Sequence, residues 1–152
     1  MGKKEPSAKT TTIMSYLSLI IIVLLIIFLV KSCSSKKETF DFSSVPEYEV
    51  IKVDDLSLDR FIRLNYYIKA SDNYTKEQIE LIAKAIVEKE KEERKVSTIS
   101  FVFYSENDDI SGGVPSIGTG EWAPYGDWSK AMEVEPGDYS KHEYKFDFNK
   151  KF

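Results

Sequence analysis

The distribution of hydrophobic residues divides the chain into one long apolar run and a following stretch in which apolar and polar positions alternate. The run at residues 13–30 contains no charged residue. As a helix it would be roughly 27 Å long at ~1.5 Å per residue, which matches the hydrocarbon thickness of a bilayer. Lys9 and Lys31 flank the run and can extend toward the two interfaces. The pattern predicts a transmembrane helix, preceded by a basic tail at residues 1–12.

Alternation with a period of two predicts β-strands after this segment. Residues 48–53 alternate, and residues 60–69 place one apolar set on a single face. That set is Ile62, Leu64, Tyr66 and Ile68. Because successive strand residues point to opposite faces, the second strand has one face on a core. Asp54 and Asp55 indicate a turn or bulge between the two strands, and the β-branched and aromatic residues at 97–104 predict a central strand.

Between the second predicted strand and the central one, apolar residues recur with the period of a helix. Thr75 and Gln78 have the spacing of a capping box, in which each side chain bonds the backbone of the other residue. Apolar residues then recur at helical spacing, at Ile79, Ile82, Ala83, Ile86 and Val87. The pattern predicts an amphipathic helix over residues 76–94. The charged run at residues 88–95 is typical of a solvated helix end with i,i+4 pairs.

The C-terminal third of the chain is rich in turn residues. We expect a glycine-interrupted strand at 114–122, a turn at 123–126, an ambiguous segment at 128–134 and an edge strand at 143–148. The resulting order predicts an α+β fold in two layers. One amphipathic helix would cover a mainly antiparallel sheet of four to five strands, in addition to the N-terminal transmembrane helix.

Charge is distributed unevenly along the chain. Residues 1–39 hold six lysines against two glutamates, a net charge of +4, which suits a membrane surface with anionic lipid. Residues 40–152 hold the other 15 basic and 23 acidic residues, a net charge of −8. An acidic domain argues against nucleic acid as a partner, because phosphate binding needs clustered Lys and Arg. The polar residues 31–44 are expected to link the membrane segment to a domain over residues 45–152.

Three versions of the apolar segment are compatible with the sequence: an uncleaved signal anchor, a cleaved secretory signal, and a lipoprotein signal with Cys33 lipidated. The run exceeds the ~7–15 apolar residues of a cleaved signal, which favours the anchor. The residues before Cys33 resemble a bacterial lipobox only partly, since Lys31 stands where that motif has a small or apolar residue. Three lysines flank each side of the segment, so the positive-inside rule decides little. A short charged tail held inside predicts an extracytoplasmic C-terminal domain in the cell membrane.

The stretch Gly120-Glu-Trp-Ala-Pro-Tyr-Gly-Asp-Trp-Ser-Lys-Ala131 is long and rich in rare residue types. Together with the preceding helix-strand pair and the Phe103-Tyr104 … Asp108-Asp109 … Gly113 loop, it resembles an uncharacterised domain of bacterial and phage proteins. Several of those proteins look membrane-anchored or lipoprotein-like. The resemblance covers residues 48–139 and implies a location and a fold, but no activity and no site residue. It also raises the alternative that a phage or mobile element encodes the chain.

Trp122, Tyr125 and Trp128 form the main candidate ligand or partner surface. Aromatic side chains beside Gly and Pro in a turn can stack on a sugar ring or bind an apolar side chain of a partner. The competing interpretation is that the two tryptophans fix the turn to the core, because tryptophan is highly buried on average. In that case Tyr125 is the exposed member of the three.

Titratable residues supply the other candidates. Asp108 and Asp109 offer oxygen ligands to a hard cation such as Ca²⁺, but their spacing differs from an EF-hand loop and fits a solvated turn. His142 is the one histidine and has no partner at a recognised motif spacing. Cys33 is the one cysteine, which excludes an intrachain disulfide and structural Cys/His zinc sites. The sequence therefore predicts no cofactor and no catalytic constellation.

Two functions of different classes follow from these observations. The first is a membrane-tethered, non-catalytic domain that presents its sheet and aromatic turn to an envelope protein or a cell-wall polymer. The second is a small envelope hydrolase or metal-dependent enzyme, which would use Asp108, Asp109, Glu121 or His142 in a shared cleft. The second requires these groups to converge within hydrogen-bond reach.

Overall fold

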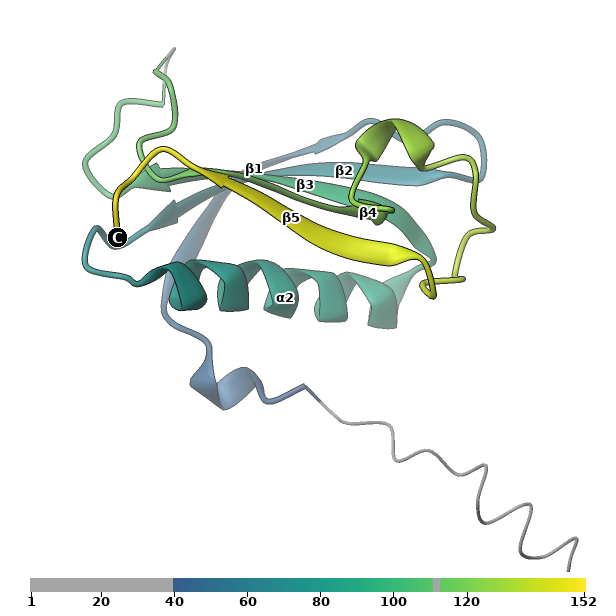
Figure 1. Cartoon of the computed structure of the whole chain (residues 1–152), viewed down its shortest axis with the longest axis horizontal. Helices are drawn as coiled ribbons and strands as arrows, with labels where there is room; N and C mark the ends of the chain where they lie inside the picture. Colours follow the sequence, from purple (N-terminus) through teal and green to yellow (C-terminus); the bar gives the residue numbers. More distant parts are fainter. Residues whose placement is uncertain (1–39, 111–112) are drawn as a thin grey trace, which may run out of the picture. The chain divides into compact units, whose positions relative to one another are not determined.

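The computed structural model of the chain describes residues 40–110 and 113–152. Phe40–Phe152 forms one compact unit, in which one long helix covers one face of a five-stranded sheet (Figure 1). The predicted α+β class is confirmed. Within the two described ranges, no helix combines the length and the apolar character that a membrane crossing needs. The predicted transmembrane segment at 13–30 and Cys33 lie outside these ranges.

The five strands lie in the sheet in the order in which they occur in the chain. The elements are β1 (Tyr48–Asp55), β2 (Ile62–Ala70), α2 (Lys76–Glu93), β3 (Val96–Ser105), β4 (Gly118–Pro124) and β5 (His142–Phe148), with short 3-10 helices η1 (Phe42–Ser44) and η2 (Trp128–Lys130). Three of the four strand pairs are antiparallel, as expected. β2 and β3 are parallel, because α2 returns the chain to the end at which β2 began.

The start of α2 is capped as the sequence predicts. Thr75 Oγ1 accepts a hydrogen bond from the Gln78 amide at 3.3 Å, and Gln78 Oε1 accepts one from the Thr75 amide at 2.9 Å. The five apolar residues of the helical pattern are all buried. The charged helix end is solvated only in part, because Glu90 is buried. Its carboxylate accepts hydrogen bonds from the Tyr66 hydroxyl and, at 2.6 Å, from Arg94 Nε.

The core lies between α2 and the helix-facing side of the sheet. The largest fully buried side chains of that side come from the two central strands, and include Leu64, Ile68, Ile99, Phe101 and Phe103. The predicted apolar stripe of β2 faces this core, with Ile62 half-buried at its end. The alternating apolar residues therefore form the core face of β2, as their period of two predicts.

On β4 two glycines face aromatic rings of β5. Gly118 is paired with Phe148, and Gly120 with Phe146. A Cβ on Gly120 would lie 2.5 Å from the Phe146 ring. The rings of Tyr144, Phe146 and Phe148 stack along β5 with centroid distances of 6.1 and 5.7 Å. The glycines, which the sequence pattern treats as interruptions, leave the space into which β5 packs.

Some predicted boundaries differ from the structure. Asp54 and Asp55 continue β1 in regular pairs with β2, and the bulge lies at Ile51. Aspartates are tolerated there because β1 is an edge strand. Ala123 and Pro124 belong to β4 rather than to the turn that follows it, and residues 114–117 precede that strand.

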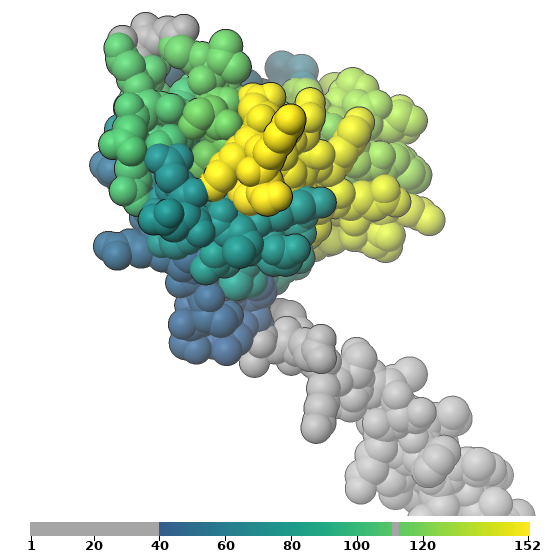
Figure 2. All heavy atoms as spheres, turned by 60° about the vertical axis from the view of Figure 1, so that its left-hand side comes forward, coloured from purple at the N-terminus to yellow at the C-terminus, as the bar shows by residue number. Residues whose placement is uncertain are grey.

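The end of the chain holds two loops together. The Asn149 amide donates to the Ile117 carbonyl at 3.0 Å, and Asn149 Nδ2 donates to the Pro115 carbonyl at 2.8 Å. Lys150 Nζ donates to the carbonyl of Asp72, just before α2. Figure 2 shows the C-terminal segment in yellow between the green loop after β3 and the teal start of α2.

Candidate binding surface

The sheet has an open face on the side away from α2. Residues paired across neighbouring strands point to the same face, so the register defines this surface. Its members are Glu49, Lys52, Asp54, Arg63, Asn65, Tyr67, Lys69, Thr98, Ser100, Val102, Tyr104, Thr119, Glu121, Ala123, Glu143, Lys145 and Asp147. Figure 1 shows η2 and the loop after β3 on this side of the sheet, above its two ends.

One end of the open face is covered by η2. The Trp128 amide donates to Glu121 Oε2 at 3.1 Å, and the Arg63 guanidinium lies 4.9 Å from the centroid of the Trp128 ring. Glu121 and Arg63 are both members of the open face. The half-buried Trp128 therefore fixes η2 onto the sheet, and it offers only part of its ring to a partner.

Tyr125 lies in a strained turn directly before η2. Tyr125 and Gly126 have φ angles of 57° and 62°, and the Asp127 amide donates to the Pro124 carbonyl at 3.1 Å. These are the features of a type I′ turn, which favours Asn-Gly. The Tyr125 side chain is 49% exposed, and Lys130 Nζ lies 5.3 Å from its ring centroid. A left-handed tyrosine costs about 1–2 kcal/mol, and burial of the ring does not offset this.

Tyr125→Asn is expected to stabilise the domain by about 1 kcal/mol, because asparagine tolerates the left-handed conformation of this turn. Tyr125→Ala is the matched control, since it also removes the ring but keeps the unfavourable φ. Chemical unfolding followed by circular dichroism measures the difference. Equal stabilities of the two variants would contradict the proposed strain.

Trp122 lies on the opposite side of the sheet from Trp128. It is 4% exposed, and its ring centroid lies 4.2 Å from that of His142 and 5.2 Å from that of Tyr139. This placement fits the interpretation in which Trp122 belongs to the core. Of the three aromatic candidates, the structure brings Tyr125 and Trp128 to one end of the open face and separates Trp122 from them.

Two hollows lie on the open face, one toward the edge strand β1 and the other over β3, β4 and β5. One has a volume of about 490 Å³ and is lined by Ile51, Lys52, Tyr67, Tyr104, Asp109 and Ile110. The other has about 440 Å³ and lies over β3, β4 and β5, beside Val102, Thr119 and Lys145. Ile51 and Lys52 are adjacent in sequence and yet line the same hollow, which the bulge at Ile51 explains. Apolar atoms make up the larger part of the lining of both hollows, and Tyr67 and Tyr104 belong to the first of them.

The acidic loop after β3 is held by its own backbone. Asp108 Oδ2 accepts hydrogen bonds from the amides of Ser105 at 2.9 Å and Ser116 at 3.1 Å. Burial raises the pKa of Asp108, but these hydrogen bonds outweigh it, so that the pKa lies below its usual value. Asp109 lines the larger hollow. In the part of the chain that the structure describes, no three His, Cys, Asp or Glu side chains are arranged to hold a metal ion.

The residues named for an enzyme are distributed over separate places. His142 lies at the start of β5 and faces the helix side, where Nε2 donates to the Ser97 carbonyl at 2.9 Å. Burial lowers the pKa of His142, partly offset by that hydrogen bond. Glu121 lies on the open face, and Asp108 lies in the loop after β3. Because the sheet separates His142 from Glu121, the described residues do not form the shared cleft that the second hypothesis requires.

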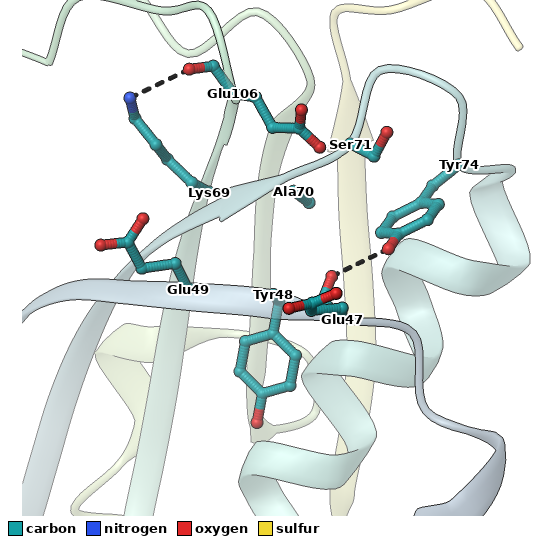
Figure 3. A pocket seen from close by; sticks show the side chains of 8 residues that line it. All are labelled: Glu47, Tyr48, Glu49, Lys69, Ala70, Ser71, Tyr74 and Glu106. Atoms are coloured by element: carbon teal, nitrogen blue, oxygen red, sulfur yellow. Dashed lines mark hydrogen bonds between the residues drawn. The ribbon is translucent and has the colours of Figure 1, made fainter.

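Another hollow, of about 310 Å³, lies where β1 begins and β2 ends (Figure 3). Its lining residues are Glu47, Tyr48, Glu49, Lys69, Ala70, Ser71, Tyr74 and Glu106. Lys69 Nζ donates to the Glu106 carbonyl at 3.1 Å, and the Tyr74 hydroxyl donates to the Glu47 carbonyl at 3.0 Å. These bonds fix the walls of the hollow. Its residues come from several segments, so no local pattern in the sequence indicated it.

Tyr67 and Tyr104 were not predicted as site residues from the sequence. Tyr67 could have been found from the pattern of the second predicted strand, because it lies on the polar face of that strand, opposite the apolar stripe. Tyr104 is the next-to-last residue of β3, a strand of mostly buried residues, and is itself 6% exposed. No protein-family model, no curated protein and no solved structure matches the chain. The resemblance to a bacterial and phage domain stays a prediction from the sequence.

Proposed function

We propose that this chain is a membrane-anchored, non-catalytic binding protein that presents the open face of its α+β domain to a sugar-containing polymer of the cell envelope. The observation that carries the proposal is the sheet face opposite α2, which is open between η2 and the loop after β3 and contains two hollows. A face of this kind is solvated on a free domain and available to a long ligand that crosses several strands.

The chemistry of the open face favours a sugar over a protein partner. The partly exposed ring of Tyr67 offers a flat apolar contact with a polar edge, which suits a sugar ring. Lys52 Nζ lies 5.3 Å from the centroid of this ring, and Tyr104 is buried beside the same hollow.

The middle of the face carries uncharged polar side chains, including Asn65, Ser100 and Thr119, whereas charged residues such as Lys52 and Lys145 lie on its two edge strands. The core of a protein–protein interface is usually more apolar than this and is depleted of residues such as serine. A hydroxyl-rich ligand can instead accept and donate hydrogen bonds to such groups.

The charge of the domain restricts the polymer further. Residues 40–152 carry a net charge of −8, which repels strongly anionic polymers. A glycan of low net charge is therefore the preferred ligand. The proposed anchor is the apolar segment at residues 13–30, with the domain outside the cytoplasm. This location would place the open face within reach of the envelope.

Binding to purified peptidoglycan sacculi, stripped of anionic polymers, tests the proposal. The full-length chain in detergent micelles is expected to co-sediment with sacculi. Tyr67→Ala is expected to weaken binding about tenfold, since it removes an aromatic stacking surface. Val50→Ala is the matched control, because Val50 is exposed on the other side of the sheet. No co-sedimentation of the unaltered chain, or equal losses in both variants, would refute the proposal.

Intact mass of the chain purified from membranes tests the anchor in the same preparation. A full-length mass is expected for an uncleaved transmembrane segment. A mass that begins at Cys33 and includes acyl chains would replace this anchor with a lipid and would leave the orientation of the domain as proposed. Recovery of the chain only from the soluble fraction would refute membrane anchoring.

A further inference from the structure

β1 is an edge strand whose outer side has no strand neighbour among the described residues. The Leu56 amide donates to the Arg63 carbonyl at 2.8 Å, which makes these two residues a hydrogen-bonded pair with β2. In an antiparallel ladder such pairs alternate with non-hydrogen-bonded pairs. Lys52 and Asp54 therefore direct their backbone groups toward β2. Val53 and Asp55 direct theirs outward, where a further strand can bond them.

The side chains along β1 are also open on the helix side. Val50 and Val53 are paired with Ile68 and Tyr66, so both point to the face that α2 covers at the centre of the sheet. They nevertheless remain 42% and 41% exposed. The other edge strand differs, because α2 lysines lie over its rings, with Lys84 Nζ 6.0 Å from the Tyr144 centroid. β1 thus combines free backbone groups with exposed apolar side chains.

The charged side chains of β1 restrict the register in which the β1 strands of two copies can pair. A twofold antiparallel pair is defined by the residue on its axis. An axis at Lys52 opposes two lysines, an axis at Glu49, Asp54 or Asp55 opposes two acidic residues, and an axis at Val50 or Ile51 places the bulge at or beside the centre of the pair. Among residues 49–55 an axis at Val53 avoids both problems, and it places Lys52 of each copy opposite Asp54 of the other.

We propose that two copies of this chain pair through β1 as an antiparallel dimer with its twofold axis at Val53. Lys52 and Asp54 already form an ion pair within each copy, with Lys52 Nζ 2.8 Å from Asp54 Oδ1. In the dimer each Lys52 also faces the Asp54 of the other copy, so four charges of alternating sign meet on the open-face side and the two Val53 side chains meet on the helix side. Lysine on an edge strand usually opposes pairing, so this register gains specificity from the aspartate that faces it. Because the axis is normal to the sheet, the open faces of both copies form one continuous surface.

Oxidative cross-linking of the full-length chain in membranes tests the dimer. A Cys33→Ser background removes the native thiol, and Val53→Cys introduces a thiol on the axis. Hydrogen-bonded antiparallel residues have Cα atoms about 5.5 Å apart, which permits a disulfide. Val50→Cys is the matched control on the same strand and face. Its two copies would be separated by roughly 20 Å along the strands at ~3.3 Å per residue, beyond disulfide reach.

We expect the Val53→Cys chain to give about fivefold or more cross-linked dimer than the Val50→Cys chain, since only the first lies within disulfide reach. Both valines are exposed, so neither substitution disturbs the core. Equal cross-linking of the two chains would indicate random collision and would overturn the dimer. An absence of cross-linking in both chains would also overturn it.

Charge reversal tests the register in the Val53→Cys background. Lys52→Asp makes both contacts between the copies repulsive, together with the ion pair within each copy, and is expected to lower cross-linking about tenfold. Adding Asp54→Lys restores opposite charges across the interface and is expected to restore cross-linking. Failure of the double variant to recover would overturn the register at Val53, whereas thermal unfolding measured in parallel identifies any loss of the fold itself.

Discussion

Replacing Trp122 with alanine is expected to lower the free energy of unfolding by about 3–5 kcal/mol, as for other large aromatic residues in cores. The side chain is 4% exposed and contacts the rings of Tyr139, His142 and Tyr144. Those three residues come from the start of β5 and the loop before it. Loss of the indole leaves a cavity that these neighbours cannot fill without moving β5. The effect is therefore on folding rather than on a ligand contact.

Urea unfolding of the full-length chain in detergent, followed by far-ultraviolet circular dichroism, measures this change without a tryptophan signal. Trp128→Ala is the control, because Trp128 is half-buried and lies on the surface of the sheet. We expect it to cost about 1 kcal/mol, as for a partly exposed side chain with one cation–π contact. An unchanged stability of Trp122→Ala, together with weaker sacculus binding, would instead support Trp122 as a contact residue.

The sequence predicted α2 and β2 correctly, because the patterns that define them involve residues close together in the chain. The capping pair Thr75 and Gln78 marks the start of α2, and the five apolar positions that follow set its inward face. The alternating stripe of β2 likewise depends only on the period of a strand. These features could be recognised because each is determined by residues a few positions apart.

Features that depend on distant residues were not predicted. The parallel pair β2–β3 results from the path of α2, which the hydrophobic pattern of either strand does not specify. The larger hollow of the open face combines a bulge in β1 with Tyr67, Tyr104 and the loop after β3. Glu90 belongs to a run of charged residues in the sequence, and its burial depends on the Tyr66 hydroxyl.

Gly118→Ala is expected to destabilise the domain by about 3 kcal/mol, through backbone strain and overpacking together. Gly118 has a φ angle of 148°, which residues with a side chain rarely adopt. A Cβ there would lie 2.8 Å from Phe148 Cα and would also contact the Asp147 carbonyl oxygen. Both atoms belong to the backbone of β5, so no side-chain rotation relieves the contact. The strand pair itself has to separate.

Two neighbouring substitutions separate this cause from a general weakness of β4. Thr119→Ala lies between the glycines at an exposed position and is expected to change stability by less than about 0.5 kcal/mol. Gly120→Ala is expected to give an intermediate loss, because the atoms in its way belong to the Phe146 ring, which can tilt. Chemical unfolding of the three variants gives the order. If Gly118→Ala were as stable as Thr119→Ala, the close approach of β4 and β5 would not require glycine. The packing of the β5 rings would then not depend on the space that the two glycines leave.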